Sequence, residues 1–525
     1  MRLAPAALVA VIAFGAPARG DDSFEAQANL HLRTTTVRNE PSSAVLYDRQ
    51  LGTFDVRPYL VPEGEDRYGS LYASLRLAGS FRGGDLRWVV LADTGEVRRR
   101  AFPLVAQVCA ADTPTGLTVW PGAPMHRCIS APVPLEETRY AAPIAVMNGR
   151  SVDEELRHTL LVREAYLAWS FGKAGFATLR AGRKRTTIGD GLVHDDYATG
   201  VELGLDLGAL GPSWAMGVGV FQPTRDFPST VRGISPVAVA RVDYLPSLFE
   251  RAGIFVAALR DRSGSVGEIV RGAVIEQRVG ALDQAIGTAA EPTFARDLAR
   301  TLDAPLESDA SLGWAGTSGS LAPWRGTKLG WTLALQGGTL HRLTTTGPLG
   351  AQVDLARDVP LRGGVASARL DVDLGEKVTV APSFLYLSGA PPPSPGQPYR
   401  SFIGIVPYVT TTNLFFNGGL SETFSARQAT AAGVNGRGVV APTLAITYDP
   451  WEKVTVQGKA AYLRSAVPGP FGGSTYGTEA DLTATWMPRP WLMVGIEADA
   501  LWTDDFYAAR ATITKTLLAV DFLTP

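Results

Sequence analysis

The chain has 525 residues, 46% of them hydrophobic, and a mean hydropathy of +0.06. These values exclude a disordered chain and a membrane protein built from many helices. The formal net charge of −2 and a pI near 6.3 argue against a general nucleic-acid binder. The 56 glycines and 36 prolines fit a chain with many turns.

Residues 1–20 have the pattern of a signal peptide. Met1-Arg2 gives a positive start, residues 3–14 are almost wholly apolar, and small residues at 16–20 suit cleavage after Ala18 or Gly20. The apolar run is too short to span a bilayer. The alternative is a buried N-terminal helix. The signal peptide predicts export, and no later segment is apolar for long enough to form a membrane helix, so the mature chain 21–525 is either soluble or a barrel.

Strict alternation of apolar and polar residues is the main signal in the mature chain. On residues 24–32 the apolar face consists of Phe24, Ala26, Ala28, Leu30 and Leu32. A period of two predicts a strand with one apolar and one wet face. The same pattern recurs over residues 71–78, 201–207 and 492–499.

Alternation marks seventeen strands, and their connections alternate between short turns and long polar loops over 96–155, 262–325 and 390–437. If short turns are periplasmic and long loops extracellular, the two kinds of connection must alternate along the chain. This parity fails between residues 336 and 363. A strand over 339–347, after a turn at Gly337-Gly338, restores the parity and brings the count to eighteen. The predicted strands are 24–36, 68–82, 85–95, 156–170, 174–183, 198–208, 213–222, 234–245, 252–261, 327–336, 339–347, 363–374, 378–389, 438–449, 454–465, 477–487, 491–502 and 511–522.

These features predict an all-β fold: a transmembrane antiparallel up-and-down β-barrel of about 18 strands with long extracellular loops, forming one domain over 21–525 in the bacterial outer membrane. Aromatic residues support this fold because they flank the short turns, where rings meet the lipid head groups. They are Tyr244, Tyr448, Trp451, Trp486 and Trp491. The alternatives are a soluble sandwich, propeller or β-helix, but we find no fixed repeat of 20 to 50 residues.

Two parts of the chain resemble a known family. Residues 180–185 (Arg-Ala-Gly-Arg-Lys-Arg), with Gly189-Asp190-Gly191, resemble the GRQR…G-G stretch of the alginate export family of outer-membrane porins, and residues 163–167 resemble the strand before it. Residues 402–407 and 412–419 resemble the run that precedes the family's late strands. The resemblance implies an eighteen-stranded monomer with a basic lumen that exports or admits an anionic polysaccharide or another small solute. Lys184 replaces the family's usual glutamine.

Residues opposite the apolar face should line the pore. In the first half of the chain the basic residues on this face are Arg33, Arg76, Arg87, Arg180 and Arg241, and Glu202 is among their acidic counterparts. In the second half the acidic residues on this face are Asp371, Asp373, Glu479, Asp481, Glu497 and Asp499, with Lys328, Arg369, Lys459 and Lys515 as basic counterparts. A basic wall facing an acidic wall would favour polar, charge-bearing solutes. The alternative is a set of neutralised ion pairs without selectivity.

Three further expectations concern single features. Arg163 shares a face with Ala165 and Leu167, so we expect it at the lipid interface rather than in the lumen. Cys109 and Cys128, the only cysteines, could form a disulfide in an oxidising compartment or stay unpaired. The loop 390–437 carries an apolar segment, 402–406, so folding into the lumen is one candidate arrangement and a hairpin above the membrane is the other.

We expect a porin or exporter that gives passive passage to small polar or anionic solutes, with polysaccharide as one candidate. The alternative is a non-conducting structural or adhesive barrel that displays its loops. The sequence has no GxSxG motif, P-loop or CxxC pair, so we expect no enzyme, cofactor or metal. The expected partners are membrane lipid and lipopolysaccharide, the solute, and the barrel-assembly machinery during insertion, with the chain a monomer that binds no nucleic acid.

Overall fold

The computed structural model describes residues 23–38, 46–48, 53–55, 65–81, 85–94, 97–100, 105–109, 128–132, 161–172, 176–208, 214–223, 235–247, 249–262, 264, 266–267, 270, 306–346, 352–391, 397–405, 407–416, 418–420, 433, 436–469, 472–507 and 510–524. The predicted signal peptide, residues 1–20, lies outside the described residues.

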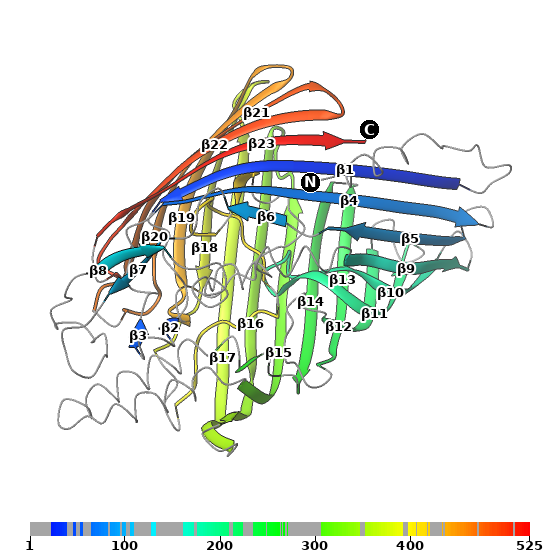
Figure 1. Cartoon of the computed structure of the whole chain (residues 1–525). Coiled ribbons are helices and arrows are strands. Elements are labelled where there is room, and N and C mark those ends of the chain that lie inside the picture. The colour runs from blue at the N-terminus through cyan, green and yellow to red at the C-terminus, as the bar shows by residue number, and fades with distance from the viewer. Residues whose placement is uncertain are drawn as a thin grey trace.

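Eighteen long strands form a closed antiparallel barrel. Each strand pairs with its neighbours in sequence order, and β1 pairs with both β4 and β23, which closes the ring (Figure 1). The barrel strands are β1 (Ser23–Arg38), β4 (Glu65–Phe81), β5 (Leu86–Asp93), β9 (Leu161–Phe171), β10 (Ala177–Ile188), β11 (His194–Asp206), β12 (Trp214–Pro223), β13 (Val237–Ser247), β14 (Glu250–Asp261), β15 (Leu306–Leu321), β16 (Thr327–Thr346), β17 (Gln352–Asp373), β18 (Val378–Leu387), β19 (Val439–Trp451), β20 (Val454–Arg464), β21 (Thr475–Arg489), β22 (Leu492–Thr503) and β23 (Thr512–Leu523).

Five short strands accompany the barrel. β6 (Val97–Arg100) pairs with the loop-side end of β4. Two small hairpins stand apart from the barrel sheet and consist of β2 (Leu46–Asp48) with β3 (Thr53–Asp55), and β7 (Val105–Cys109) with β8 (Cys128–Pro132). No helix within the described ranges is long and apolar enough to cross a membrane.

The outer face of the barrel is apolar because the strands alternate. On β14 the outward Ile254 and Val256 are exposed, whereas the inward Phe255 and Ala257 are buried. Neighbouring strands repeat this arrangement, as the exposed Leu333 of β16 shows. An apolar outer surface on a closed barrel is what a bilayer requires, since every backbone group is paired and no sheet edge meets lipid.

Aromatic side chains surround the short-turn end of the barrel. Tyr244, Tyr448, Trp451, Trp486 and Trp491 are all exposed and lie at or next to these turns. Such a girdle marks the boundary between hydrocarbon and head groups. Together with the closed barrel and its apolar face, the girdle places the chain in the bacterial outer membrane.

The structure corrects two predicted elements. The predicted loop 262–325 contains strand β15, and Gly337-Gly338 is not a turn, because Gly337 pairs with both Gly313 and Arg362 inside the continuous strand β16. These two errors cancelled in the count of eighteen. The first arose because β15 presents small or polar residues outward, such as Gly313 and Ala315, so it lacks an apolar alternation. The second arose because a Gly-Gly pair has the composition of a turn.

Part of the predicted loop 390–437 packs against the inward face of the barrel. Phe402 and Ile403 are buried, the indole Nε1 of Trp314 donates to the carbonyl of Ile403 at 3.0 Å, and the Ile403 amide donates to Gln336 at 2.6 Å. An apolar segment of this kind reaches a buried position only where other apolar side chains receive it. The inward faces of β15 and β16 provide that surface.

Candidate functional site

The tip of the β10–β11 hairpin bends into the barrel. The Ile405 amide donates to the carbonyl of Val193 at 2.7 Å, and the Tyr408 amide donates to the carbonyl of Gly191 at 2.9 Å. The turn contains Gly189 and Gly191 with φ of 59° and 92°, a left-handed region that favours glycine. The Gly189-Asp190-Gly191 stretch therefore shapes an inward-folded tip that contacts the segment from the 390–437 loop.

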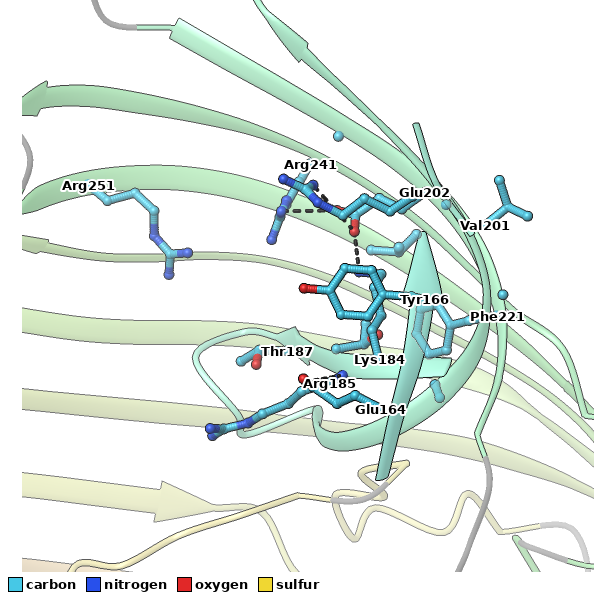
Figure 2. Close-up of a pocket in the computed structure, with 17 residues that line it drawn as sticks. Glu164, Tyr166, Lys184, Arg185, Thr187, Val201, Glu202, Phe221, Arg241 and Arg251 are labelled. Carbon is cyan, nitrogen blue, oxygen red and sulfur yellow. Dashed lines mark hydrogen bonds and ion pairs between the residues drawn. The ribbon is translucent and has the colours of Figure 1, made fainter. Parts of the chain in front are cut away.

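A cavity of about 440 Å³ lies beneath this tip, against the inward faces of β9 to β14 (Figure 2). Its basic lining residues are Arg180, Lys184, Arg185, Arg241 and Arg251, and its acidic lining residues are Glu164 and Glu202. Because these side chains come from five of the six adjacent strands β9 to β14, the closed sheet fixes their relative positions. We call this cavity the basic pocket.

Glu202 is at the centre of the basic pocket's charges. The ammonium group of Lys184 donates to its carboxylate, Arg241 Nη2 donates at 3.1 Å, and Arg180 Nη1 lies 3.9 Å away (Figure 2). One carboxylate is thus shared among three cations. Arg180 and Arg241 are also more than a third exposed, at 38% and 39% of the side chain, so both guanidinium groups face the cavity with hydrogen-bonding capacity to spare.

The other two arginines of the basic pocket have carboxylate partners of their own. Arg185 binds Asp195 in a bidentate pair at 2.7 and 2.8 Å, and Arg251 binds Asp190. Asp190 lies in the turn between the strands, where burial raises the pKa of its carboxyl and Arg251 opposes the rise. Asp243 is a further carboxylate beside the pocket, 3.7 Å from Arg241 and 3.9 Å from Arg251. The positive charges are therefore closest together around Glu202, where three cations meet one side chain.

The geometry of the basic pocket suits a small anion. Guanidinium groups bind carboxylate and phosphate through two parallel hydrogen bonds. Gly217 leaves room for this arrangement, because a Cβ there would lie 3.0 Å from Nε of Arg241. Tyr166 and Phe221 add aromatic surface to the lining. The site can hold the acidic group of a solute while its remaining atoms contact a ring.

The five arginines predicted to line the lumen do not form one basic wall in the structure. Arg180 and Arg241 lie together in the basic pocket. Arg33 is buried and binds Asp521 through both terminal nitrogens, with Nη2–Oδ2 at 2.9 Å. Arg76 lies 3.6 Å from Glu25, and Arg87 is exposed on the inward face of β5. Arg33 therefore tightens the closing seam between β1 and β23 and does not present its charge to a solute.

The four carboxylates on β21 and β22 lie beneath a segment that we call the strap, residues 412–416 and 418–420. Glu479 accepts from the amides of Leu414 and Phe415 at 2.6 and 3.1 Å. Glu497 accepts from the Leu420 amide at 2.6 Å. Lys515 also binds Glu497 at 2.6 Å. These contacts hold the strap against the inner wall.

Asn413 occupies the centre of the strap's attachment. Its backbone amide donates to Asp481 at 3.1 Å, its side-chain amide donates to Asp499 at 2.9 Å, and its carbonyl accepts from Lys515 at 3.1 Å. Glu479, Asp481, Glu497 and Asp499 are all buried. This corrects the expectation that they line the open lumen, because the strap covers them and donates a hydrogen bond to each of the four.

Asp371 and Asp373 lie elsewhere, at the short-turn end of the barrel. They line a second cavity of about 570 Å³ together with Lys328 and Arg369. Arg369 Nε donates to Asp371 at 2.7 Å, and the Thr379 hydroxyl donates to Asp373 at 2.8 Å. With Arg325, this cavity has three basic and two acidic lining residues, so its two signs of charge are nearly balanced.

Arg163 is not at the lipid interface, contrary to the prediction. Its side chain is 1% exposed, and its Nε donates to Asp93 at 2.8 Å. The β5–β9 register shifts at Leu91, next to Arg163, so the alternation that holds from Ala165 onward does not continue to this residue. Val162 is the exposed neighbour instead.

For the two cysteines, the structure describes only the positions of the backbone. Cys109 and Cys128 are direct partners in the β7–β8 register, at one end of this small hairpin. Directly opposed residues on antiparallel strands have their Cβ atoms about 4.5–5.5 Å apart. The disulfide between them remains a prediction.

Three basic residues of the basic pocket were not among the predicted lumen residues: Lys184, Arg185 and Arg251. Lys184 follows Arg180 by four residues on one strand, so alternation alone would have placed both on the same face. Arg251 shares the parity of the inward Phe255 and could have been found in the same way. Arg185 and its partner Asp195 have no such signal, because the inward bend of the hairpin brings them to the cavity.

Within the described ranges, no group of three or more metal-ligating side chains could hold an ion. No family model matches the chain, and no curated protein does. The resemblance to the alginate export family therefore remains a prediction.

Solved structures of similar fold include three proteins of Pseudomonas aeruginosa. OpdQ has a TM-score of 0.46 at 10% identity, over 96% of this chain and 98% of that one. The outer membrane protein OprD has a TM-score of 0.44 at 10% identity, over 95% and 93%. OccK11 (OpdR) has a TM-score of 0.42 at 12% identity, over 95% and 96%. At these values the likeness carries no conclusion about function.

Proposed function

We propose that this chain is an outer-membrane porin that gives passive passage to small anionic solutes, which bind transiently at the basic pocket. The observation that carries the proposal is the cluster around Glu202, where Arg180, Lys184 and Arg241 share this carboxylate and the guanidinium groups of Arg180 and Arg241 face the cavity. A cluster of this sign inside a lumen raises the local concentration of anions and slows the entry of cations.

The binding energy expected for an anion at the basic pocket is small enough to allow its release. A unit charge 4 Å from another contributes about 1 kcal/mol in water and about 4 kcal/mol at an effective dielectric constant near 20. Arg180 and Arg241 are partly exposed, so the lower figure applies to each. Conduction requires a site that attracts a solute and still releases it. Contributions of this size meet both requirements.

The size of the basic pocket favours small solutes. Its volume of about 440 Å³ lies in the lower part of the range for small-molecule sites. Monocarboxylates, dicarboxylates and phosphate esters of small alcohols fit this volume and supply the acidic group that the arginines bind. The resemblance to the alginate export family adds an anionic polysaccharide to the classes that require testing.

A second candidate is a barrel that does not conduct. It is favoured by the apolar packing of Phe402, Ile403 and Ile405 against the inward face, next to the hairpin tip at Val193. If this packing closes the lumen, the loops would be the functional part of the molecule. Conductance of the purified barrel separates the two candidates.

The experiment is a liposome-swelling series with the full-length protein. Three solutes are matched in size and differ in charge: a dicarboxylate, a diamine and a neutral sugar. A fourth, larger solute is an acidic oligosaccharide of the alginate type. We expect the small anion to enter fastest and the diamine slowest. Equal rates for the anion and the diamine would refute the role of the basic pocket, and absence of entry by every solute would support the non-conducting barrel.

A further inference from the structure

A groove of about 580 Å³ lies on the barrel wall between β12 and β16. One row of directly paired residues crosses it, and each residue in the row is the register partner of the next. The row is Val220, Ala238, Ala258, Gly313 and Gly337. Short side chains on five adjacent strands leave the backbone surface low, and this produces the depression. We call it the wall groove.

The wall groove faces lipid and not the lumen. Ala258 continues the outward series of Ile254 and Val256, which are 64% and 55% exposed. Gly337 continues the outward series of Leu333 and Leu335, which are 52% and 68% exposed. Large apolar side chains thus border the groove on the short-turn side. A depression in this surface must be filled by hydrocarbon, because an empty one forfeits van der Waals contact along its lining.

The height of the wall groove assigns it to one leaflet. Ala258 follows the start of β14 at Glu250 by about eight residues, which places it roughly 20 Å above the short-turn end for a tilted strand. The apolar band of such barrels is about 25 Å tall. The groove therefore lies in the half of the band nearer the long loops, next to the outer leaflet.

Two arginines flank the groove, Arg260 on its loop side and Arg362 at its β17 end. Arg260 is the next outward residue after Ala258 and lines the groove. Arg362 is the register partner of Gly337 and is exposed. Arg260 shares its charge with Asp309, 2.8 Å away, and keeps 40% of its side chain exposed. Cations at the upper edge of an apolar band are positioned for the phosphate groups of a lipid.

We propose that the wall groove is a binding site for a phosphate-bearing lipid of the outer leaflet, namely lipopolysaccharide. One acyl chain lies over Ala258, Gly313 and Gly337, and the lipid phosphates contact Arg260 and Arg362. The apolar floor recognises the chain and the arginines recognise the anion, so both halves of the ligand have a complement at the correct height. The site is on the outer wall and does not depend on what the lumen passes.

Gly337 offers a direct way to fill the groove without disturbing the barrel. A Cβ at Gly337 would meet no atom within 4 Å, and its φ is not in the left-handed region. Gly337→Leu should therefore occupy the space of the acyl chain. Gly458 is the matched control, because it is a strand glycine on β20 whose Cβ would also meet nothing within 4 Å. Gly458→Leu adds the same side chain to another part of the barrel.

The arginines have a matched control as well. The double variant Arg260→Gln/Arg362→Gln removes both charges at the margin. Arg464→Gln removes one exposed arginine at the loop-side end of β20, where Arg464 donates to Ser474 at 3.0 Å and is far in register from the groove. Heat-modifiable gel mobility of every variant checks that the barrel has folded.

The readout is native mass spectrometry of the full chain with added lipid A, compared with dephosphorylated lipid A. We expect one bound lipid A on the wild type, at least fivefold lower occupancy in Gly337→Leu and in the double arginine variant, and wild-type occupancy in both controls. Dephosphorylation should lower occupancy on the wild type and leave the double variant unchanged. Equal occupancy in Gly337→Leu and Gly458→Leu would overturn the proposal.

A second measurement needs no variant. Lipid A with a photoreactive acyl chain should label the peptide containing residues 249–262 on the wild-type barrel. Labelling confined to other strands would overturn the proposal. A dimer that is lost in Gly337→Leu while lipid occupancy stays constant would do the same, since it would show that a second copy of the chain covers the groove.

Discussion

Replacing one charge of the basic pocket should change its affinity for a small anion, and the sign depends on which charge is removed. Arg241→Gln removes one of the three cations that surround Glu202, whereas Glu202→Gln removes the carboxylate that these cations share. Glu202→Gln keeps nearly the same side-chain volume, whereas Arg241→Gln keeps a polar side chain but shortens it. We expect weaker anion binding in Arg241→Gln and tighter anion binding in Glu202→Gln.

The size of each effect follows from distance and exposure. A bound carboxylate that contacts Arg241 would lie about 4 Å from the charge, where Coulomb energy in water is about 1 kcal/mol. The 39% exposure of Arg241 keeps its surroundings close to water. Because 1.4 kcal/mol corresponds to a tenfold change, Arg241→Gln should raise the dissociation constant about fivefold. Glu202→Gln should lower it by a similar factor.

The assay is the concentration dependence with which a dicarboxylate interrupts the current through single barrels in a planar bilayer. Measurements at 0.1 M and 1 M salt add a second check, since screening shortens the Debye length from about 10 Å to about 3 Å. The differences between variants should shrink at 1 M. Shifts of equal sign in both variants, or shifts that do not change with salt, would refute the electrostatic reasoning.

Three other replacements test the account at separate places. Asp521→Asn removes the carboxylate charge that pairs with buried Arg33 and should destabilise the barrel by about 3–5 kcal/mol in urea unfolding; an unchanged midpoint would contradict the seam's role. Glu479→Gln weakens three hydrogen bonds to the strap by about 1 kcal/mol each, so the single-channel current should become larger or fluctuate, and a current identical to wild type would contradict this. Ile254→Arg puts a charge near the middle of the lipid-facing band and should reduce the free energy of folding into vesicles by about 2–4 kcal/mol; no loss would place this face outside the membrane.

The sequence was sufficient for the architecture because period-two alternation survives wherever a strand separates lipid from lumen. It placed Arg180 and Arg241 on the inward face, and the structure brings these two residues together in the basic pocket. The sequence did not reveal strand β15, because Gly313 and Ala315 carry too little side chain to mark an apolar face. The same small residues form the wall groove, so the feature that concealed the strand also creates the proposed site.

The features that the sequence could not predict depend on where the loops fold and on irregular strand pairing. Alternation correctly put Glu479 and Asp499 on the inner side but gave no sign that the strap would cover them. The register shift beside Arg163 turns this side chain to the opposite face of the strand from the one expected, and no residue type near it indicates the shift. The contact between Arg251 and Asp190 requires the hairpin tip to bend inward, and this bend depends on tertiary structure that the alternation pattern does not show.

The reversal potential of the wild-type barrel in a potassium chloride gradient tests the central claim most directly. The cationic cluster of Arg180, Lys184 and Arg241 inside the lumen should make chloride more permeant than potassium, so the potential should have the sign of an anion-selective pore at 0.1 M salt. A cation-selective potential, or a barrel that carries no current, would contradict passage of small anions through the basic pocket.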